Sequence, residues 1–219
     1  MNRYAIIVAG GKGLRMGGPT PKQFLPFKGR PVIAWTLERF LTFDSTIQLI
    51  VVLPENHKET WQGIQKTYFP TAAIRIATGG AERFDSVKAG LALIQDPSGL
   101  VAVHDAVRPF VSEETLSQSF QSAATYGSGV ASIPLKDSIR ELVSDGSKAR
   151  DRSHFRLMQT PQTFRVGELQ EAYRKATHNA FTDDATVYEA AGYRVRLVEG
   201  SFENIKITTP EDLKKKPRF

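Results

Sequence analysis

Two short segments of the chain are apolar on consecutive residues, Ile6-Ile7-Val8 and Ile50-Val51-Val52. A strand with one face in water alternates apolar and polar residues, so these runs predict strands that are buried on both faces. Such strands occur mainly in α/β proteins, where helices cover both sides of a mostly parallel sheet. The two runs therefore belong in the interior of a sheet.

Apolar runs typical of strands alternate with helical patterns along much of the chain. Strands are expected at 4–9, 47–53, 73–77, 100–104 and 130–133, and helices at 32–40, 55–68, 84–93 and 113–126. Later helices are expected at 166–177, at 184–191 and from Pro210, and later strands at 195–198 and 205–207. This alternation predicts an α/β, Rossmann-like fold: a mostly parallel twisted sheet with helices on both faces. No repeat or linker divides the chain, so we expect one domain over residues 1–219.

A protruding β-arm is predicted at residues 136–153. This stretch is rich in charge and centres on Asp145-Gly146, a pair typical of a type I′ hairpin turn. Because an isolated two-stranded arm is marginally stable in water, we expect it to pack against a second copy of the chain. A mobile surface hairpin is the alternative.

The formal charge of +6 does not by itself indicate a nucleic-acid-binding protein. Four of these charges come from the last residues, and subtracting them leaves +2 for the rest of the chain; they belong to Lys214, Lys215, Lys216 and Arg218. A basic tail of this kind is typical of a solvated chain end. We therefore expect no nucleic-acid partner.

The sequence contains no cysteine, which excludes disulfides and thiolate metal sites. Any metal must therefore bind oxygen or nitrogen ligands, and a hard cation on carboxylates is expected. The apolar runs are too short to cross a membrane, and the first residues lead into a strand without the apolar core of a signal peptide. We expect a cytoplasmic protein with no membrane partner.

A glycine-rich loop over residues 9–18 follows the first predicted strand. Its glycines allow backbone N–H groups to approach a phosphate chain closely, and Ala9, Gly10 and Gly11 begin the loop. It is not a Walker A loop, because no Gly-Lys-Ser/Thr follows at the required spacing. Met16 stands at the third glycine position of a dinucleotide fingerprint, so that family is disfavoured as well.

The loop and the proline-stiffened stretch after it carry two cations. Arg15 lies within the glycine-rich segment, and Lys22 follows Pro21. Two fixed cations beside an anion-binding loop predict a polyphosphate ligand; a glycine turn with solvated charges is the alternative. We expect Lys22 to be an exposed loop residue that contributes little to stability.

Asp105 follows the predicted strand 100–104, at the end of the sheet where α/β proteins bind ligands. One carboxylate combined with phosphate oxygens and water suits Mg²⁺, so we predict Asp105 as a Mg²⁺ ligand. Arg108 is a candidate to bind a second phosphate through two hydrogen bonds. A helix cap near Ser112 or an ion pair with Arg108 is the alternative for Asp105. For His104 a structural role is expected, because no metal or triad partner lies nearby.

A second glycine turn, residues 78–87, precedes another predicted helix. Backbone groups of Gly80 and Ala81 and the hydroxyl of Ser86 are suited to bind the edge of a pyrimidine base, with Ala9 and Gly10 on the other side. A plain helix N-terminus is the alternative.

Three residues in the second half of the chain are candidates for binding a second substrate, which would act as the acceptor. Ser138 stands at the base of the arm, Arg152 on its return, and Thr182 ahead of a predicted helix. The alternatives are an ion pair of Arg152 within the arm and a helix cap at Thr182 or Asp183. Lys206 lies in an apolar predicted strand, so its ammonium must point into a polar crevice or form an ion pair.

Together these segments closely resemble the 2-C-methyl-D-erythritol 4-phosphate cytidylyltransferases of the non-mevalonate isoprenoid pathway, from Tyr4 to about Leu213. The resemblance is carried by an ordered set of motifs: the Ala-Gly-Gly loop with Arg15, Pro21-Lys22-Gln23, Gly79-Gly80, Asp85-Ser86, His104-Asp105-Ala106-Val107-Arg108-Pro109, Asp151-Arg152-Ser153, Thr160-Pro161-Gln162, Thr182-Asp183-Asp184-Ala185 and Asn204-Ile205-Lys206.

The resemblance implies a Mg²⁺-dependent enzyme that transfers CMP from CTP to 2-C-methyl-D-erythritol 4-phosphate and releases pyrophosphate. It implies that Arg15 and Lys22 hold the triphosphate, that Asp105 contacts Mg²⁺, and that Lys206 stabilises charge near the α-phosphate. Ser86 and the backbone around Gly80 would bind cytosine.

The same resemblance implies that the acceptor is bound by Ser138, Arg108, Arg152 and Thr182. Arg152 and the arm would reach across a homodimer. Family members often carry threonine at the position of Ser138, and serine keeps the hydroxyl.

Two alternatives to this family remain. Ribitol 5-phosphate cytidylyltransferases are similar through the first half, but Asp151-Arg152-Ser153 and Thr182-Asp183-Asp184-Ala185 resemble the erythritol enzymes more closely. A non-catalytic nucleotide-binding module is the alternative from another class. The complete set of Arg15, Lys22, Asp105 and Lys206 gives it no support.

Overall fold

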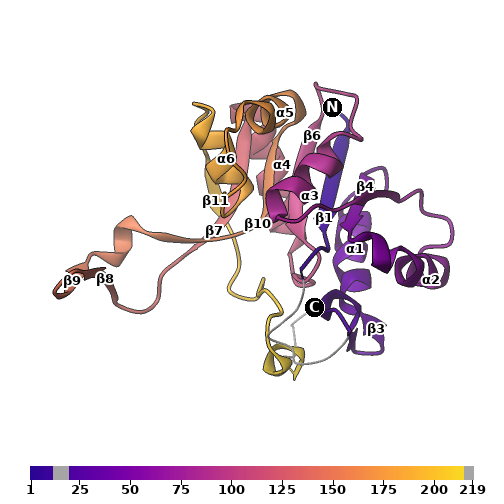
Figure 1. The fold of residues 1–219 in the computed structure, drawn as a ribbon, viewed down its shortest axis with the longest axis horizontal. Coiled ribbons are helices and arrows are strands. Elements are labelled where there is room, and N and C mark those ends of the chain that lie inside the picture. The colour runs from indigo at the N-terminus through magenta and orange to yellow at the C-terminus, as the bar shows by residue number, and fades with distance from the viewer. Residues whose placement is uncertain (12–19, 215–219) are drawn as a thin grey trace.

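The computed structural model describes residues 1–11 and 20–214. Its main feature is a sheet of seven strands in the order β11-β7-β10-β6-β1-β4-β5 (Figure 1). These strands are β1 (Arg3–Val8), β4 (Gln48–Leu53), β5 (Arg75–Thr78), β6 (Leu100–Asp105), β7 (Ser128–Pro134), β10 (Arg156–Arg165) and β11 (Leu197–Glu199).

The sheet is mostly parallel, as predicted. Strand β1 pairs in parallel with both β4 and β6, and the pairs β4–β5 and β7–β11 are parallel too. The exception is β10, which is antiparallel to both β6 and β7. The chain reaches β10 from β7 through a hairpin arm, and a hairpin joins antiparallel strands where a helical crossover joins parallel ones.

Helices cover both faces of this sheet, which confirms the predicted fold class. One face carries α1 (Val32–Phe43), α2 (Lys58–Tyr68) and α4 (Glu113–Tyr126), and the other α3 (Arg83–Leu91), α5 (Val166–Lys175) and α6 (Asp184–Ala190). Ile7 belongs to the core beneath α1, whereas Ile6 belongs to the core beneath α3. Successive side chains of a strand point to opposite faces, so consecutive apolar residues serve two cores at once.

The carboxyl ends of β1 and β6 meet at one end of the sheet. Asp105, the last residue of β6, lies opposite Val8, the last residue of β1. Because these strands are parallel neighbours, the segment after β1 and the carboxylate of Asp105 emerge side by side. The fold thus brings the glycine-rich segment and Asp105 together.

Several short elements complete the described chain. A small hairpin of β2 (Pro26–Phe27) and β3 (Arg30–Pro31), which was not predicted, packs Phe27 into a third core with Phe110 and Ile207. The 3-10 turns are η2 (Lys22–Phe24), η3 (Glu55–His57), η4 (Arg152–His154) and η5 (Pro210–Lys214). Among residues 1–11 and 20–214, no helix is long and apolar enough to cross a membrane.

The predicted arm is present as the hairpin of β8 (Ile139–Val143) and β9 (Gly146–Arg150). Figure 1 shows it extending away from the rest of the molecule between β7 and β10. The predicted type I′ turn is wrong, because that turn needs positive φ at both central residues and Asp145 does not have it. Gly146 takes the positive φ, 96°, as the first residue of β9.

The C-terminal elements differ from the prediction. Residues 205–207 form no strand; within the described part of the chain, one backbone hydrogen bond joins them to a distant segment, from Ile207 N–H to the carbonyl of Val107 (2.9 Å). The helix predicted from Pro210 is only the 3-10 turn η5. Strand β10 was missed, because its centre, 159–162, is polar and contains a proline, joined by a cis peptide bond at Thr160-Pro161.

Candidate active site

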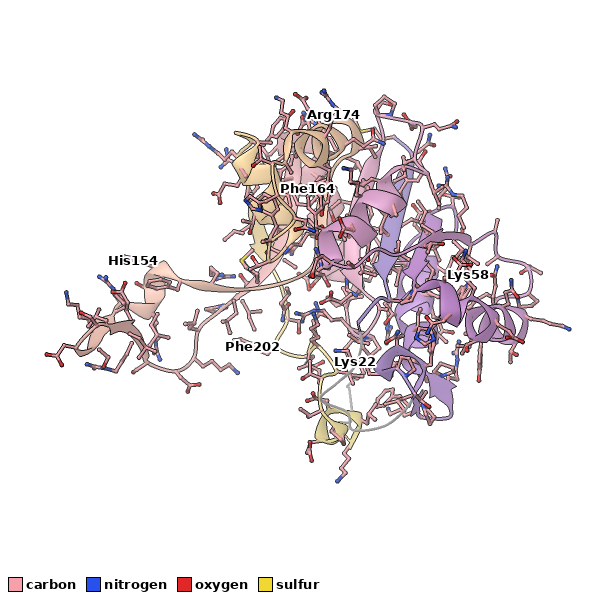
Figure 2. All side chains as sticks on the ribbon, viewed as in Figure 1. Lys22, Lys58, His154, Phe164, Arg174 and Phe202 are labelled. Carbon is pink, nitrogen blue, oxygen red and sulfur yellow. The ribbon has the colours of Figure 1, made fainter. Side chains whose placement is uncertain are left out.

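A pocket of about 370 Å³ lies where β1 and β6 end. Ligands of open α/β sheets bind at this end, outside the carboxyl ends of the strands. Figure 2 shows Lys22, which lines it, in the lower part of the molecule. The lining residues are Val8, Ala9, Gly10, Gly11, Lys22, Gln23, Gly80, Ala81, Glu82, Arg83, Ser86, Asp105, Ala106, Val107 and Lys206.

Nine residues predicted from the sequence line this pocket together: Ala9, Gly10, Gly11, Lys22, Gly80, Ala81, Ser86, Asp105 and Lys206. They come from distant parts of the chain: the glycine-rich segment with Lys22, the glycine turn 78–87, the end of β6 and the segment of Lys206. Arg15, which was predicted to join them, lies outside the described residues.

The backbone after β1 is fixed by a side chain that the sequence analysis did not single out. Gln23 is buried, and its amide Nε2 donates a hydrogen bond to the carbonyl of Ala9 (2.7 Å). The N–H of Ala9 donates to the carbonyl of Val52 (2.8 Å). Both backbone groups of Ala9 are therefore held in place. Its position directly after Lys22 was the available signal for Gln23.

Lys22 is only 9% exposed, so the expectation of an exposed loop lysine is wrong. The turn η2 brings it against the start of the glycine-rich segment. A Cβ atom built on Gly11 would lie 3.8 Å from Cε of Lys22. The lysine therefore lies beside the backbone that was predicted to bind phosphate.

The loop before α3 forms a second wall of the pocket. A capping box closes the helix start, since the side chains of Glu82 and Asp85 each accept a hydrogen bond from the other's backbone N–H. The hydroxyl of Ser86, buried at the pocket, donates to the carbonyl of Glu82 (3.1 Å). A Cβ atom on Gly80 would lie 2.4 Å from Cβ of Asp85, so the close turn requires glycine there. The free N–H groups of such a helix start favour anions and polar ligand edges.

Asp105 is held by two cations. Its Oδ2 lies 3.1 Å from Nε of Arg108 and 3.1 Å from Nζ of Lys206. Burial alone would raise the pKa of Asp105, but the charges of Lys206, Arg83 and Arg108 outweigh it and hold the pKa well below its usual value. The carboxylate is thus ionised at neutral pH. Both functions considered for it, an ion pair and a ligand-facing carboxylate, are compatible with this geometry.

His104, the neighbour of Asp105, is fully buried in the sheet. Its Nε2 donates to the carbonyl of Arg108 (3.1 Å), and its ring packs edge-on against Phe40. Burial lowers the pKa of His104 to about 4. A neutral imidazole bonded in the core agrees with the structural role that was expected.

Arg108 does not itself line the pocket. Its Nη1 donates to the carbonyl of Asn204 (2.8 Å), and its side chain is 12% exposed. Asn204 is itself fully buried and donates from Nδ2 to the carbonyl of Thr160 (2.8 Å). Arg108 thus links Asp105 to the segment that carries Lys206. The predicted phosphate contact of Arg108 remains a prediction.

The oxygen ligands of the pocket fit Mg²⁺ through one carboxylate, that of Asp105. Within the described residues, no group of three acidic or histidine side chains converges on a metal site. Asp105 lines the pocket, and its Oδ2 is engaged by two cations, Arg108 and Lys206. Mg²⁺ commonly binds one or two carboxylates together with phosphate oxygens. Asp105 therefore suits a Mg²⁺ ion that a bound phosphate chain helps to hold.

Three predicted acceptor residues lie outside the pocket lining. Ser138 and Arg152 are exposed on the arm, where the guanidinium of Arg152 donates to the carbonyl of Lys136. Thr182 is exposed too, and its Oγ1 lies 3.4 Å from Oγ1 of Thr186. The helix cap is the next residue, Asp183, whose carboxylate accepts from Thr186 N–H. Within one chain, none of these three residues lines the pocket.

The sequence analysis also missed Arg83, a third cation of the pocket beside Lys22 and Lys206. Arg83 opens α3 and pairs with Asp184 across the molecule. The sequence feature that could have indicated Arg83 is its position in the glycine turn 78–87, which was considered only for base binding.

Comparison with known proteins identifies relatives along the whole chain. The model of the 2-C-methyl-D-erythritol 4-phosphate cytidylyltransferase family matches residues 4–216. A protein of that name from Phocaeicola vulgatus is 50% identical over 214 residues, which cover 98% of this chain and 97% of the relative. Another, from Bacteroides thetaiotaomicron, is 46% identical over the same length.

Solved structures give the same result. A 4-diphosphocytidyl-2C-methyl-D-erythritol synthase from Anaerococcus prevotii superimposes with a TM-score of 0.85 at 30% identity, covering 97% of this chain and 93% of that one. The 2-C-methyl-D-erythritol 4-phosphate cytidylyltransferase of Thermus thermophilus has a TM-score of 0.78 at 32% identity, covering 98% and 96%.

Proposed function

The chain belongs to the 2-C-methyl-D-erythritol 4-phosphate cytidylyltransferase family, and on this premise we propose how its pocket carries out the reaction. The activity is the transfer of CMP from CTP to 2-C-methyl-D-erythritol 4-phosphate, which yields 4-diphosphocytidyl-2-C-methyl-D-erythritol and pyrophosphate for isoprenoid synthesis. These matches favour the erythritol acceptor over ribitol 5-phosphate.

CTP occupies the pocket with its base against the loop before α3. Gly80, Ala81 and Ser86 bind the cytosine edge, and Ala9 and Gly10 close the other side. The observation that supports this is the pairing, in one pocket, of a glycine turn at a helix start with three cations, Lys22, Arg83 and Lys206. Lys22, Arg15 and backbone N–H groups from Gly11 onward then hold the triphosphate.

Catalysis consists of alignment and charge stabilisation. An oxygen of the acceptor phosphate attacks the α-phosphorus of CTP, a new P–O bond forms, and the bond to the β-phosphate oxygen breaks to release pyrophosphate. The acceptor phosphate is already anionic at neutral pH, so no general base is required. Lys206 stabilises the charge that develops at the α-phosphate, and Lys22 the charge on the departing pyrophosphate.

Asp105 holds Mg²⁺ through its carboxylate. When bound, the ion neutralises phosphate charge and orients the triphosphate. Lys206 and Arg108 keep the carboxylate ionised and fix its orientation through Oδ2.

The acceptor is bound by Arg108, Ser138, Arg152 and Thr182, with Arg152 supplied by the arm of a second copy of the chain. The support for a homodimer is the arm itself. It stands away from the body (Figure 1), and Leu142 in it is 86% exposed. A two-stranded arm of this kind gains stability by packing on a partner. We also propose a single nucleotidyltransferase domain and a cytoplasmic location.

Pyrophosphate release tests the proposal. The purified protein is incubated with CTP and Mg²⁺ and with either 2-C-methyl-D-erythritol 4-phosphate or ribitol 5-phosphate. We expect release with the erythritol phosphate alone, and a loss of about 10²–10³ in kcat for Lys22→Gln. Release with ribitol 5-phosphate alone would refute the acceptor assignment, and full activity of Lys22→Gln would refute the role of that lysine.

A further inference from the structure

Arg83 connects the pocket to the start of α6. It lines the pocket, yet its Nη2 lies 2.5 Å from Oδ2 of Asp184. The other carboxylate oxygen, Oδ1, accepts a hydrogen bond from the hydroxyl of Tyr173 (2.6 Å). The side chain of Asp184 is fully buried and that of Arg83 is 25% exposed. Both oxygens of a buried carboxylate are therefore occupied, and its charge is balanced by a cation that faces the pocket.

Aromatic packing joins the same two segments beside this ion pair. The ring of Phe84 stacks on that of Phe181, with centroids 5.8 Å apart, and on that of Tyr173, at 4.6 Å. Phe84 follows Arg83 in α3, and Phe181 precedes Thr182. The loop that faces the base and the segment of Thr182 are thus tied by both charge and packing.

The start of α6 is also held from β10. Nε2 of Gln162 donates to Oδ2 of Asp183 (2.9 Å), and Oε1 of Gln162 accepts from the N–H of Ala185 (2.9 Å). Thr182 lies just before these residues, and the contact of its own hydroxyl, to Thr186, is long at 3.4 Å. The position of Thr182 is therefore set by its neighbours.

We propose that Arg83 is a positioning residue for the transfer: through Asp184 it fixes the segment of Thr182 against the loop of Gly80, and so sets the distance between acceptor and nucleotide. The inference rests on the proposed function, in which Gly80 binds the base and Thr182 the acceptor. A buried ion pair contributes little net stability compared with apolar packing, so stability alone does not account for this pair. Alignment of the two substrates accounts for it, because a misplacement of about 1 Å can lower the rate of an in-line reaction about 10²-fold.

The test measures both substrates separately in Arg83→Gln. We expect kcat/KM for the acceptor to fall about 10²-fold, while the Kd for CTP, measured by calorimetry, changes less than about threefold. Arg83→Lys keeps a cation near Asp184 and should recover part of the loss. Asp184→Asn should reproduce the effect of Arg83→Gln, and the double variant should cost no more than either single one.

Two further variants separate positioning from folding. Arg165→Gln removes another arginine at a helix start, one that pairs with Glu168 (3.2 Å), and should lower stability without changing either substrate's KM. Tyr173→Phe removes one hydrogen bond from Asp184 while keeping the ring stack, so it remains usable if Arg83→Gln does not fold. Tyr173→Phe should lower kcat/KM for the acceptor by a smaller factor than Arg83→Gln does.

Opposite outcomes are distinct. A lower melting temperature of Arg83→Gln with an unchanged kcat/KM for the acceptor would make the pair purely structural. Loss of CTP affinity in Arg83→Gln but not in Asp184→Asn would mean that Arg83 contacts the nucleotide itself. A wild-type acceptor KM in Thr182→Ala would refute the acceptor assignment and the positioning with it. A raised acceptor KM in Thr182→Ala, together with an unchanged kcat/KM for the acceptor in Arg83→Gln, would refute the positioning role alone.

Discussion

The ammonium group of Lys206 lies 3.1 Å from Oδ2 of Asp105, although the two residues come from distant parts of the chain. Asp105 ends a central strand, whereas Lys206 lies in an irregular segment held to the body by the backbone of Ile207. The pair presents a cation and an anion to the pocket side by side. The ammonium group helps to keep the carboxylate ionised, which suits a site where phosphates and a divalent cation meet.

Lys206→Met should lower kcat about 10²–10³-fold, because it removes a cation from the reacting phosphate. Its side chain is 41% exposed, so the melting temperature should change little. Steady-state pyrophosphate release and thermal unfolding measure the two effects. Lys175→Met is the matched control: it removes a surface lysine paired with Glu171 (2.6 Å) and should leave kcat unchanged. Equal activity of both variants would contradict the assignment.

Gly80→Ala should weaken CTP binding and lower the free energy of unfolding by about 1–2 kcal/mol. The new Cβ atom would lie 2.4 Å from Cβ of Asp85 and disturb the capping box of α3. Gly63→Ala is the control, since Gly63 is exposed in α2 and has no atom near a built Cβ. That change should stabilise the protein by about 1 kcal/mol, the helix propensity difference. Urea unfolding and CTP titration compare the two; unchanged CTP affinity in Gly80→Ala would argue against base binding there.

The free energy of unfolding should decrease as the pH is lowered from about 7 to 4, because His104 is buried in its neutral form. In the folded protein its pKa is about 4, against an ordinary value near 6.5, so the unfolded state binds the proton first as pH falls. Protons therefore favour unfolding in this window, by about 3 kcal/mol at pH 4. Asp105 has a lowered pKa and adds its own loss only below its ordinary value of 3.8.

Urea unfolding at several pH values, with the metal-free protein, measures this dependence. His104→Gln retains an N–H donor for the carbonyl of Arg108 but does not titrate. Its stability should change less between pH 7 and 4 than that of the wild type. An identical pH dependence in both proteins would show that His104 is not the group responsible.

Arg152→Ala should raise the Kd of the acceptor about 10–100-fold while leaving CTP binding intact, as expected for the loss of a charge-assisted hydrogen bond. Calorimetry with each substrate measures this. Arg150→Ala is the control on the same arm, because Arg150 pairs with Glu141 and has no proposed ligand. A loss restricted to CTP would refute the acceptor role.

Mixing two inactive variants tests whether Arg152 acts across a dimer. A mixed dimer of Arg152→Ala and Lys206→Met chains contains one site with both native residues. About a quarter of the wild-type activity should therefore return after subunit exchange. If Arg152 serves its own chain, mixing restores nothing.

The parts of the fold that could be predicted are those with local signals. The consecutive apolar residues of β1 and β4 indicated central strands, and α4 matches its predicted range because Ser112 caps its start and Gly127 ends it with a φ of 93°. The shared pocket of the residues predicted to bind the nucleotide was predictable for the same reason: apart from Lys206, they lie at or after the ends of strands.

The parts that could not be predicted depend on contacts between distant residues. The polar centre of β10 resembles a loop, and only burial against other segments makes a strand of it, as when Gln162 bonds the backbone of Ala185. Lys206 was expected in a strand from its apolar neighbours, but among residues 1–11 and 20–214 the backbone of this segment bonds to a distant segment only through Ile207. Arg83 carried no sign of Asp184, its partner in space.

The arm leaves β7 and returns to β10, and these strands are antiparallel neighbours with Pro134 opposite Arg156. Its two roots therefore lie side by side, like those of any hairpin loop. Its length and surface can vary without moving a residue of the nucleotide pocket. Insertions or deletions at the tip of the arm, around Asp145, are thus compatible with an unchanged pocket at the ends of β1 and β6.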